Sequence, residues 1–175
     1  MELFKPEQSL FINGAVDAQT SSDVIMGMSK LYSADPKKMI TLFISSGGGS
    51  VGDAFALYDY TTKALKPKLQ TVALGEVNST AVMLFLMGDT RYIGRLSVMR
   101  FHKFSLIVEN TTSLTTRKAD QIRQDLERSE AEYVNIITSR SGGKITADQA
   151  RTFLDNNIAV PAIQAVKLGL AHHLL

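Results

Sequence analysis

The residues from Ser45 to Ser50 form a glycine-rich loop with three successive glycines, Gly47 to Gly49. The loop follows an apolar, β-branched stretch, Met39–Ile44, which is typical of a buried strand. Glycine has no side chain and tolerates positive φ, so a ligand can approach the backbone N–H groups of such a loop. The loop can be a plain tight turn, a phosphate cradle or half of an oxyanion hole. It lacks the Gly-Lys-Ser/Thr ending of a P-loop and the G-x-G-x-x-G spacing, which favours oxyanion binding over phosphate binding.

Ser79 is a second candidate for chemistry, in the segment Gly75–Ala81, where an apolar strand gives way to an apolar helix. Serine is a common N-cap, so capping explains the residue without any chemistry. Alternatively, the hydroxyl is a nucleophile at the helix start, with the Thr80 N–H available to a developing oxyanion. The G-x-S-x-G pattern of α/β-hydrolases is not met, because Gly75 is four residues before Ser79 and Ala81 replaces the second glycine. The segment alone leaves both interpretations open.

A nucleophilic serine needs a general base, and the chain has three histidines, His102, His172 and His173. His172 and His173 lie close to the last residue and are expected to be exposed tail residues. His102 ends a predicted strand, Val98–His102, and α/β proteins usually collect functional side chains where strands end. His102 is therefore the candidate base, with a purely structural histidine as the alternative.

The elements that must position these residues alternate between strands and helices, which predicts an α/β fold with right-handed crossovers. The loops at the carboxyl ends of the strands then gather on one side of the sheet. The length suits one domain, residues 1–175. Strands are predicted at Ser9–Asn13, Met39–Ile44, Leu69–Leu74, around Tyr92, at Val98–His102 and at the chain end. Helices are predicted at Thr20–Tyr32, Val51–Leu65, Thr80–Met87, Leu114–Arg140, Thr146–Leu154 and Ala162–Leu168.

The helix predicted at Leu114–Arg140 is unusually long. Its apolar residues Ile122, Leu126, Tyr133 and Ile137 form one stripe, and its other faces are charged. At 1.5 Å per residue it would extend about 40 Å, more than a globule of this size needs for its own core. We therefore expect the stripe to contact another subunit.

The composition excludes several classes of function. A net charge of +2, with acidic and basic residues interleaved, does not fit a nucleic-acid partner. The absence of cysteine excludes disulfides, thiolate catalysis and cysteine-ligated zinc. The longest apolar stretch, Ala81–Met87, is too short to span a bilayer, and the first residues lack the pattern of a signal peptide, so we expect a cytoplasmic protein without a membrane partner. We expect neither a cofactor nor a metal.

Taken together, the motifs resemble the Clp protease proteolytic subunit family, which has the ClpP/crotonase fold. The family's I-x-S-x-G-G-S/V strand end is matched by Ile44–Val51, and its G-x-x-x-S-x-A/G nucleophile segment by Gly75–Ala81. Its M-x-H strand end corresponds to Met99–His102 with one additional residue, and its closing A-V-x-x-G-L to Ala165–Leu170. The resemblance covers nearly the whole chain from about Leu10 onward.

The resemblance implies repeated β-β-α units with a long handle helix, the handle region being about 103–142. It also implies a serine peptidase in which Ser79 is the nucleophile and His102 the general base. Gly48 or Gly49 and Thr80 would donate backbone N–H groups to the oxyanion.

Three features of the chain differ from the family pattern. Gly47 replaces a proline of the glycine loop. The position of the catalytic aspartate, eight residues before Ala165, is occupied by Asn157, with Asp155 two residues away. The third member of the triad is therefore Asp155 or Asn157, and an asparagine in a serine triad can lower the rate about 10⁴-fold. The segment before the first strand is shorter than the family's axial loops, which weighs against a Clp-type ATPase partner.

The resemblance thus predicts a homo-oligomeric ring, with seven-membered rings stacked in pairs, that cuts unfolded proteins or short peptides. The residues Lys103–Val108 are expected to bind substrate as an added strand. One alternative is a catalytically weak or inactive ring subunit, which Asn157 supports. The other is a crotonase-fold acyl-CoA enzyme, whose chemistry does not need the pair Ser79 and His102.

Overall fold

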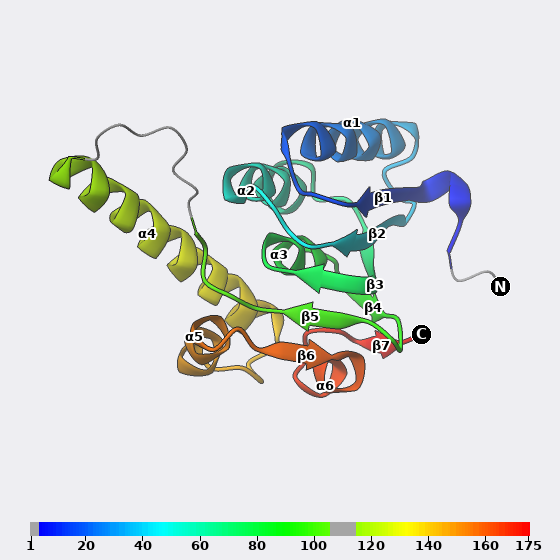
Figure 1. Ribbon diagram of the computed structural model, residues 1–175. Helices are drawn as coiled ribbons and strands as arrows, with labels where there is room; N and C mark the ends of the chain where they lie inside the picture. The colour runs from blue at the N-terminus through cyan, green and yellow to red at the C-terminus, as the bar shows by residue number, and fades with distance from the viewer. Residues whose placement is uncertain (1–3, 106–114) are drawn as a thin grey trace.

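The computed structural model describes residues 4–105 and 115–175. It has a mixed α/β fold in which helices pack on a mostly parallel sheet, as Figure 1 shows. Strands and helices alternate through the first two thirds of the chain, which confirms the predicted fold class. The strands are β1 (Ser9–Asn13), β2 (Ile40–Ser46), β3 (Leu69–Asn78), β4 (Thr90–Ile93), β5 (Val98–Arg100), β6 (Ala159–Pro161) and β7 (His173–Leu174).

The helices follow the predicted order. They are α1 (Ala18–Ala34), α2 (Val51–Asp59), α3 (Thr80–Leu86), α4 (Thr116–Arg140), α5 (Ala147–Asp155) and α6 (Ala162–Lys167), with a short 3₁₀ turn η1 (Pro6–Gln8) and a π-helical turn η2 (Tyr60–Leu65). Four of the described helices begin with side-chain caps: α1 at Asp17, α2 at Ser50, α4 at Thr115, and α5 at Thr146, which forms a capping box. The segment predicted as one helix from Val51 to Leu65 changes from α to π geometry at Tyr60.

Strand β3 organises the sheet, whose main path runs β1-β2-β3-β4-β7 with parallel pairing throughout. Its first half pairs with β4 through residues 70–73, and its last residues, Glu76–Asn78, pair with β5. Strand β3 is thus longer than the predicted Leu69–Leu74, because β5 supplies backbone partners beyond Gly75. Antiparallel strand β6 then pairs with β5.

The core lies between the sheet and the helices. All seven residues of α3 are buried, as its apolar sequence predicts, and α3 packs against β2, β3 and α4. Helix α1 packs on β1 and α2. The buried position of α3 matters for function, because its first residue, Thr80, directly follows Ser79.

The last residues were predicted to form a strand and to leave His172 and His173 exposed, and both predictions are confirmed. His173 belongs to β7 and pairs with Tyr92, and the His172 Nδ1 accepts a hydrogen bond of 3.1 Å from the Arg91 backbone N–H. Partial burial, followed by the charge of Arg91, lowers the pKa of His172, which favours the neutral ring that accepts this hydrogen bond. The tail is ordered because β4 offers a free edge with which the last residues can pair.

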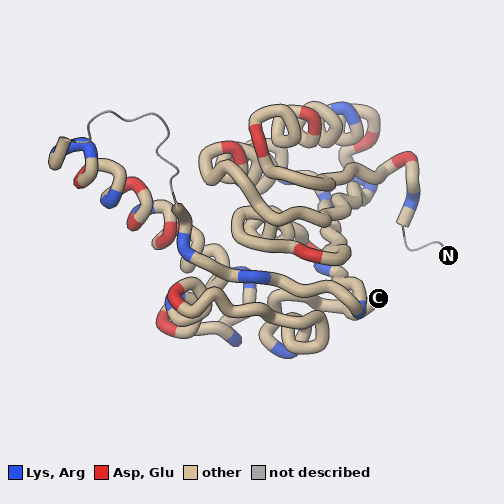
Figure 2. Tube along the Cα trace, viewed as in Figure 1, with Lys and Arg blue, Asp and Glu red and all other residues tan. Residues whose placement is uncertain are grey.

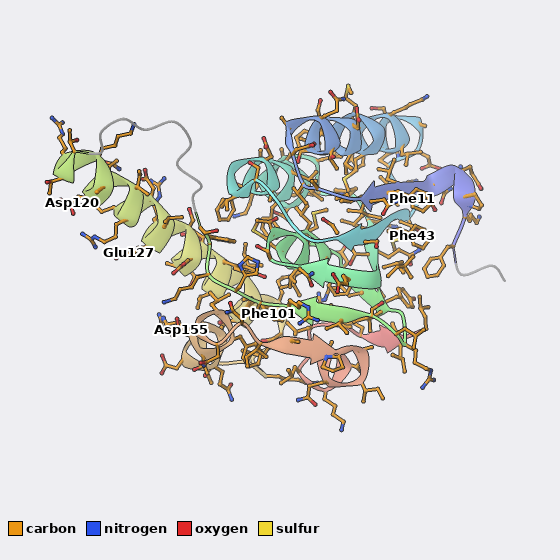
Figure 3. All side chains as sticks on the ribbon, in the orientation of Figure 1. Phe11, Phe43, Phe101, Asp120, Glu127 and Asp155 are labelled. Carbon is orange, nitrogen blue, oxygen red and sulfur yellow. The ribbon has the colours of Figure 1, made fainter. Side chains whose placement is uncertain are left out.

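The charged residues lie mainly on helices and loops, and along the outer part of α4 both signs alternate (Figure 2). Phe11 and Phe43 stack on neighbouring strands with ring centroids 5.0 Å apart, as Figure 3 shows. In the part of the chain that the structure describes, no helix combines the length and the apolarity needed to cross a bilayer.

The strand predicted at Lys103–Val108 has no counterpart at residues 103–105, which have no regular structure, and residues 106–108 lie outside the described part. The predicted helix start at Leu114 also lies outside it. Helix α4 begins at Thr116, after Thr115, whose hydroxyl accepts from Lys118 N. It ends at Arg140 as predicted.

Candidate active site

Ser79 has an unusual backbone conformation, with φ 54° and ψ −125°. A non-glycine residue with positive φ is strained by roughly 1–3 kcal/mol and persists only where its surroundings hold it. Three hydrogen bonds to its own backbone groups hold Ser79 in this conformation. Its N–H donates to the Arg100 carbonyl at 2.9 Å, and its carbonyl accepts from Val82 N at 3.0 Å and from the Tyr133 hydroxyl at 2.9 Å.

The geometry also distinguishes the two interpretations of Ser79. Ser79 occupies the N-cap position of α3, but its side chain makes no capping hydrogen bond. The hydroxyl is therefore available for chemistry at the junction between β3 and α3. Strain at a strand-to-helix turn is how α/β-hydrolases present a nucleophilic serine. Capping alone does not account for this residue.

Gly48 brings the glycine loop directly against Ser79. A Cβ added at Gly48 would lie 2.8 Å from both the Ser79 Cβ and the Asn78 carbonyl oxygen, and Gly48 has φ 94°. The loop is anchored by a bridge to Val16, whose N–H donates to the Gly48 carbonyl at 3.0 Å and whose carbonyl accepts from Ser50 N at 2.7 Å. Glycine is required at position 48 because both the space and the backbone conformation exclude a side chain.

Backbone donors for an oxyanion are present on both sides of Ser79. The Gly48 N–H donates to the Ser46 Oγ at 3.1 Å, whereas the bridge to Val16 does not use the Gly49 N–H. The Thr80 N–H belongs to the first turn of α3, where helix geometry supplies no acceptor. Gly49 and Thr80 are thus the more available of the three predicted donors.

Buried polar atoms without a partner gather at the same place. Within residues 4–105 and 115–175, the buried side-chain oxygens that lack a hydrogen bond are those of Ser21, Asn78 and Thr80. Two of these residues flank Ser79. Unsatisfied buried groups are rare, and functional sites are among the reasons for them.

His102 lies near Ser79 because of strand pairing. It follows β5 by two residues, and Arg100 of β5 accepts the Ser79 N–H. The His102 Nδ1 lies 2.8 Å from the Lys103 carbonyl oxygen. A carbonyl only accepts hydrogen bonds, so Nδ1 carries the proton and Nε2 is left as the basic nitrogen. This is the tautomer that a general base needs.

The two candidates for the third triad member lie at the end of α5 and just after it: Asp155 is the last residue of α5, and Asn157 lies in the turn that leads to β6. This turn is close to the His102 segment, since Phe101 N donates to the Ile158 carbonyl at 2.9 Å. The Asp155 carboxylate, at the outer side of α5 (Figure 3), forms an ion pair of 2.7 Å with the Lys103 ammonium. Hydrogen bonding to Asp155 raises the pKa of Lys103. Asn157 is exposed, with φ 51°.

The structure therefore brings the glycine loop after β2 against Ser79 at the end of β3. Strand β5 pairs with both β3 and β6, which places the segments of His102, Asp155 and Asn157 on the same side of the molecule as Ser79. The structure shows the Nδ1 of His102 held by a backbone carbonyl, and Asp155 held by Lys103. Sequence reasoning missed Lys103, and it assigned Tyr133 to an apolar stripe. The hydroxyl of Tyr133 was the available signal, because Tyr133 is the one polar side chain among the four stripe residues.

A hollow of about 400 Å³ lies beside the glycine loop. Gly49 to Gly52 form one wall, and α4 forms the other through Ile122 and Leu126. Such a volume accepts a few side chains of an extended peptide. Among the described residues, no three histidine, aspartate or glutamate side chains gather as metal ligands do.

Comparison of the sequence with known proteins gives matches to one family. The model of the Clp protease family matches residues 1–175. The chain is 28% identical over 167 residues to ATP-dependent Clp protease proteolytic subunit 1 of Corynebacterium glutamicum, covering 94% of this chain and 77% of the relative. It is 27% identical, with the same coverage, to the protein of that name from Corynebacterium diphtheriae. The Thermobifida fusca protein of that name is 36% identical over 85 residues, which is 49% of this chain and 37% of the relative.

Proposed function

The chain belongs to the Clp protease family, and from this membership we propose that it is a serine endopeptidase with Ser79 as its nucleophile. It would hydrolyse peptide bonds of unfolded proteins or short peptides within a homo-oligomeric ring. The observation that carries the proposal is the strained backbone of Ser79, with a hydroxyl that caps nothing, against a glycine loop in which the bridge to Val16 does not use the Gly49 N–H.

The proposed reaction follows the geometry. The Ser79 Oγ attacks the carbonyl carbon of the scissile peptide bond while the His102 Nε2 takes the hydroxyl proton. The Gly49 and Thr80 N–H groups stabilise the oxyanion, with Gly48 as the alternative donor from the loop. When the C–N bond breaks, His102 returns the proton to the leaving amine. Water, deprotonated by His102, then cleaves the acyl-enzyme ester and restores Ser79.

The third triad member decides how fast this reaction runs. In the structure, a neutral carbonyl, that of Lys103, orients the imidazole. A carbonyl fixes the tautomer, but it stabilises the imidazolium of the transition state less than a carboxylate does. Either residue could serve only after the His102 Nδ1 leaves the Lys103 carbonyl; Asp155 would then supply charge, whereas Asn157 could orient the ring without supplying charge. We propose that one of these two residues completes the site during turnover.

The same observations favour a second candidate function, a ring subunit with weak or no activity. In that case Ser79 and His102 would be present without an acid to support them. The ion pair of Asp155 with Lys103 is the specific observation in its favour.

Labelling of the assembled protein with a fluorophosphonate probe tests the proposal. We expect covalent labelling of Ser79 and peptide hydrolysis, and we expect Ser79→Ala to lose both, at least about 10³-fold for hydrolysis. Equal hydrolysis by wild type and Ser79→Ala would refute the proposal. Absence of labelling in assembled rings would favour the inactive subunit. Turnover of an acyl-CoA thioester that survives Ser79→Ala would indicate crotonase-type chemistry instead.

A further inference from the structure

Tyr133 is buried in the last third of α4, and its hydroxyl donates to the Ser79 carbonyl at 2.9 Å. The two residues are 54 positions apart in the sequence. Burial raises the pKa of Tyr133, so the hydroxyl stays protonated and remains a donor at any physiological pH. The Ser79 carbonyl also accepts from Val82 N, so the tyrosine is not needed merely to satisfy a buried carbonyl.

The hydrogen bond from Tyr133 to the Ser79 carbonyl also affects the neighbouring Thr80 N–H. The Ser79 C=O and the Thr80 N–H belong to one planar trans peptide unit, in which the two groups point in opposite directions. A donor that fixes the direction of the C=O therefore also fixes the direction of the N–H. This N–H is one of the proposed oxyanion donors.

The aromatic ring of Tyr133 contacts the segment that carries the base. It stacks with Phe104 at a centroid distance of 5.3 Å and an interplanar angle of 17°, and with Phe101 at 6.4 Å and 20°. Phe101 and Phe104 lie on either side of His102 in the sequence. Figure 3 shows Phe101 near α4 and α5, where it also packs on Phe153 at 5.5 Å.

We propose that Tyr133 is a positioning residue for the catalytic site: its hydroxyl orients the Ser79–Thr80 peptide toward the oxyanion, and its ring holds the His102 segment beside Ser79. The inference rests on the proposed peptidase function. It assigns to α4 a role inside the site of its own subunit, in addition to any contact between subunits.

Tyr133→Phe isolates the hydroxyl, because the ring and its stacking contacts remain. We expect the rate constant for fluorophosphonate labelling of Ser79 and kcat for a short peptide to fall about tenfold, a change that one misaligned hydrogen bond can produce. KM should stay unchanged, since Tyr133 does not line the hollow beside the glycine loop. The labelling endpoint, which counts competent sites, should equal that of wild type.

Tyr60→Phe is the matched control. It also removes one tyrosine hydroxyl from a hydrogen bond, that to the Ser29 Oγ at 2.6 Å, in η2 away from Ser79. We expect wild-type labelling rates and wild-type kcat. A similar loss in both variants would overturn the inference, because it would reflect general destabilisation.

The remaining outcomes are also decisive. Wild-type labelling rates in Tyr133→Phe would overturn the positioning role while leaving the peptidase proposal intact. Failure of Tyr133→Phe to fold would overturn it as well, because the hydroxyl would then be a requirement of folding. Wild-type protein that neither labels nor hydrolyses peptide would refute the proposed function itself.

Discussion

At the scale of single residues, Gly48 and Ser79 constrain each other. Gly48 has a positive φ, and its Cα faces the Ser79 Cβ so closely that no side chain fits between them. Ser79 in turn keeps its own positive φ only because its neighbours fix the backbone on both sides. Ser79 and the glycine loop are therefore one structural unit.

Gly48→Ala should lower both activity and stability. The new Cβ would stand 2.8 Å from the Ser79 Cβ and the Asn78 carbonyl, so the loop or the nucleophile must move. We expect a loss of about 1–3 kcal/mol in the free energy of unfolding and a fall in kcat/KM of at least about tenfold. Thermal unfolding and peptide hydrolysis measure the two effects.

Gly47→Ala, one position earlier in the same loop, is the control. A Cβ at Gly47 meets nothing within 4 Å, and Gly47 does not have positive φ. We expect stability and activity close to wild type. If both variants behaved alike, the close approach of Gly48 to Ser79 would not be what matters.

Asn157→Asp should raise the peptidase activity. Asn157 stands where the family pattern has its aspartate, and aspartate tolerates its φ of 51° about as well as asparagine does. A carboxylate facing His102 would stabilise the imidazolium that forms in the transition state. We expect kcat to rise at least about tenfold, measured with a short fluorogenic peptide.

Asp155→Ala identifies which residue supports His102 in the wild type. Its ion pair with Lys103 is solvent-exposed, so its loss should change stability by less than about 1 kcal/mol. An unchanged kcat would leave Asn157 or the Lys103 carbonyl as the orienting group, whereas a large fall would assign the role to Asp155. For the other variant, Asn157→Asp, a kcat at or below that of wild type would contradict the prediction that a carboxylate at position 157 stabilises the imidazolium.

At the scale of elements, Arg91 of β4 joins the ends of three helices. Its buried guanidinium donates to the carbonyls of Gly88 after α3, Arg140 at the end of α4, and Gly169 and Leu170 after α6. Helix C-termini carry partial negative charge, so these carbonyls compensate the buried cation, and the charge of the Asp89 carboxylate adds to the compensation. Burial, followed by the charge of Arg140, lowers the pKa of Arg91 to about 10, so it remains charged at neutral pH.

Arg91→Met should therefore destabilise the fold by about 3 kcal/mol or more, because it leaves several buried carbonyls without donors. Arg91→Lys should be intermediate, since an ammonium cannot reproduce the planar set of donors. Chemical denaturation measures the free energies of unfolding. Arg123→Met on the exposed part of α4, where Arg123 pairs with Glu127 at 2.8 Å, should cost less than about 0.5 kcal/mol. Similar losses in the free energy of unfolding for Arg91→Met and Arg123→Met would refute the proposed role of Arg91 in joining the helix ends.

At the scale of the whole molecule, α4 divides into two parts. Its buried residues in the described protomer are confined to the segment Tyr133–Ile137, whereas the preceding turns extend away from the sheet (Figure 1). Its 25 residues span about 37 Å. The first part carries Ile122 and Leu126, which are half-buried in the subunit alone. A ring subunit would cover them with a neighbouring copy.

Leu126→Asp should disrupt assembly without unfolding the subunit. A charge in an apolar contact between copies costs several kcal/mol, while in the free subunit the side chain reaches water. We expect a shift to smaller species in light scattering coupled to size exclusion, with far-ultraviolet circular dichroism unchanged. Gln124→Asp, at an exposed position of the same helix, is the control and should assemble like wild type. An unchanged mass for Leu126→Asp would place the subunit contact elsewhere.

The sequence by itself determined the order of the elements and the candidate nucleophile and base. The alternation of strands and helices, the apolar sequence of α3 and the glycine loop are local patterns, and each follows from propensity or periodicity within about fifteen residues. The topology rule that loops gather at strand ends was enough to group the glycine loop, Ser79 and His102. Element ends were less predictable, and β3 extended beyond Gly75 because β5 provided partners.

Only the tertiary structure decided the interactions between distant residues. The bond from Tyr133 to Ser79, the ion pair between Lys103 and Asp155, and the pairing of His173 with Tyr92 join segments 52 to 81 residues apart. Side-chain periodicity says which face of an element is apolar, but not which neighbour will pack on it. These contacts depend on the assembled sheet and on the position of α4 across it, and they help to hold the backbone of Ser79 and to pair Lys103 with Asp155.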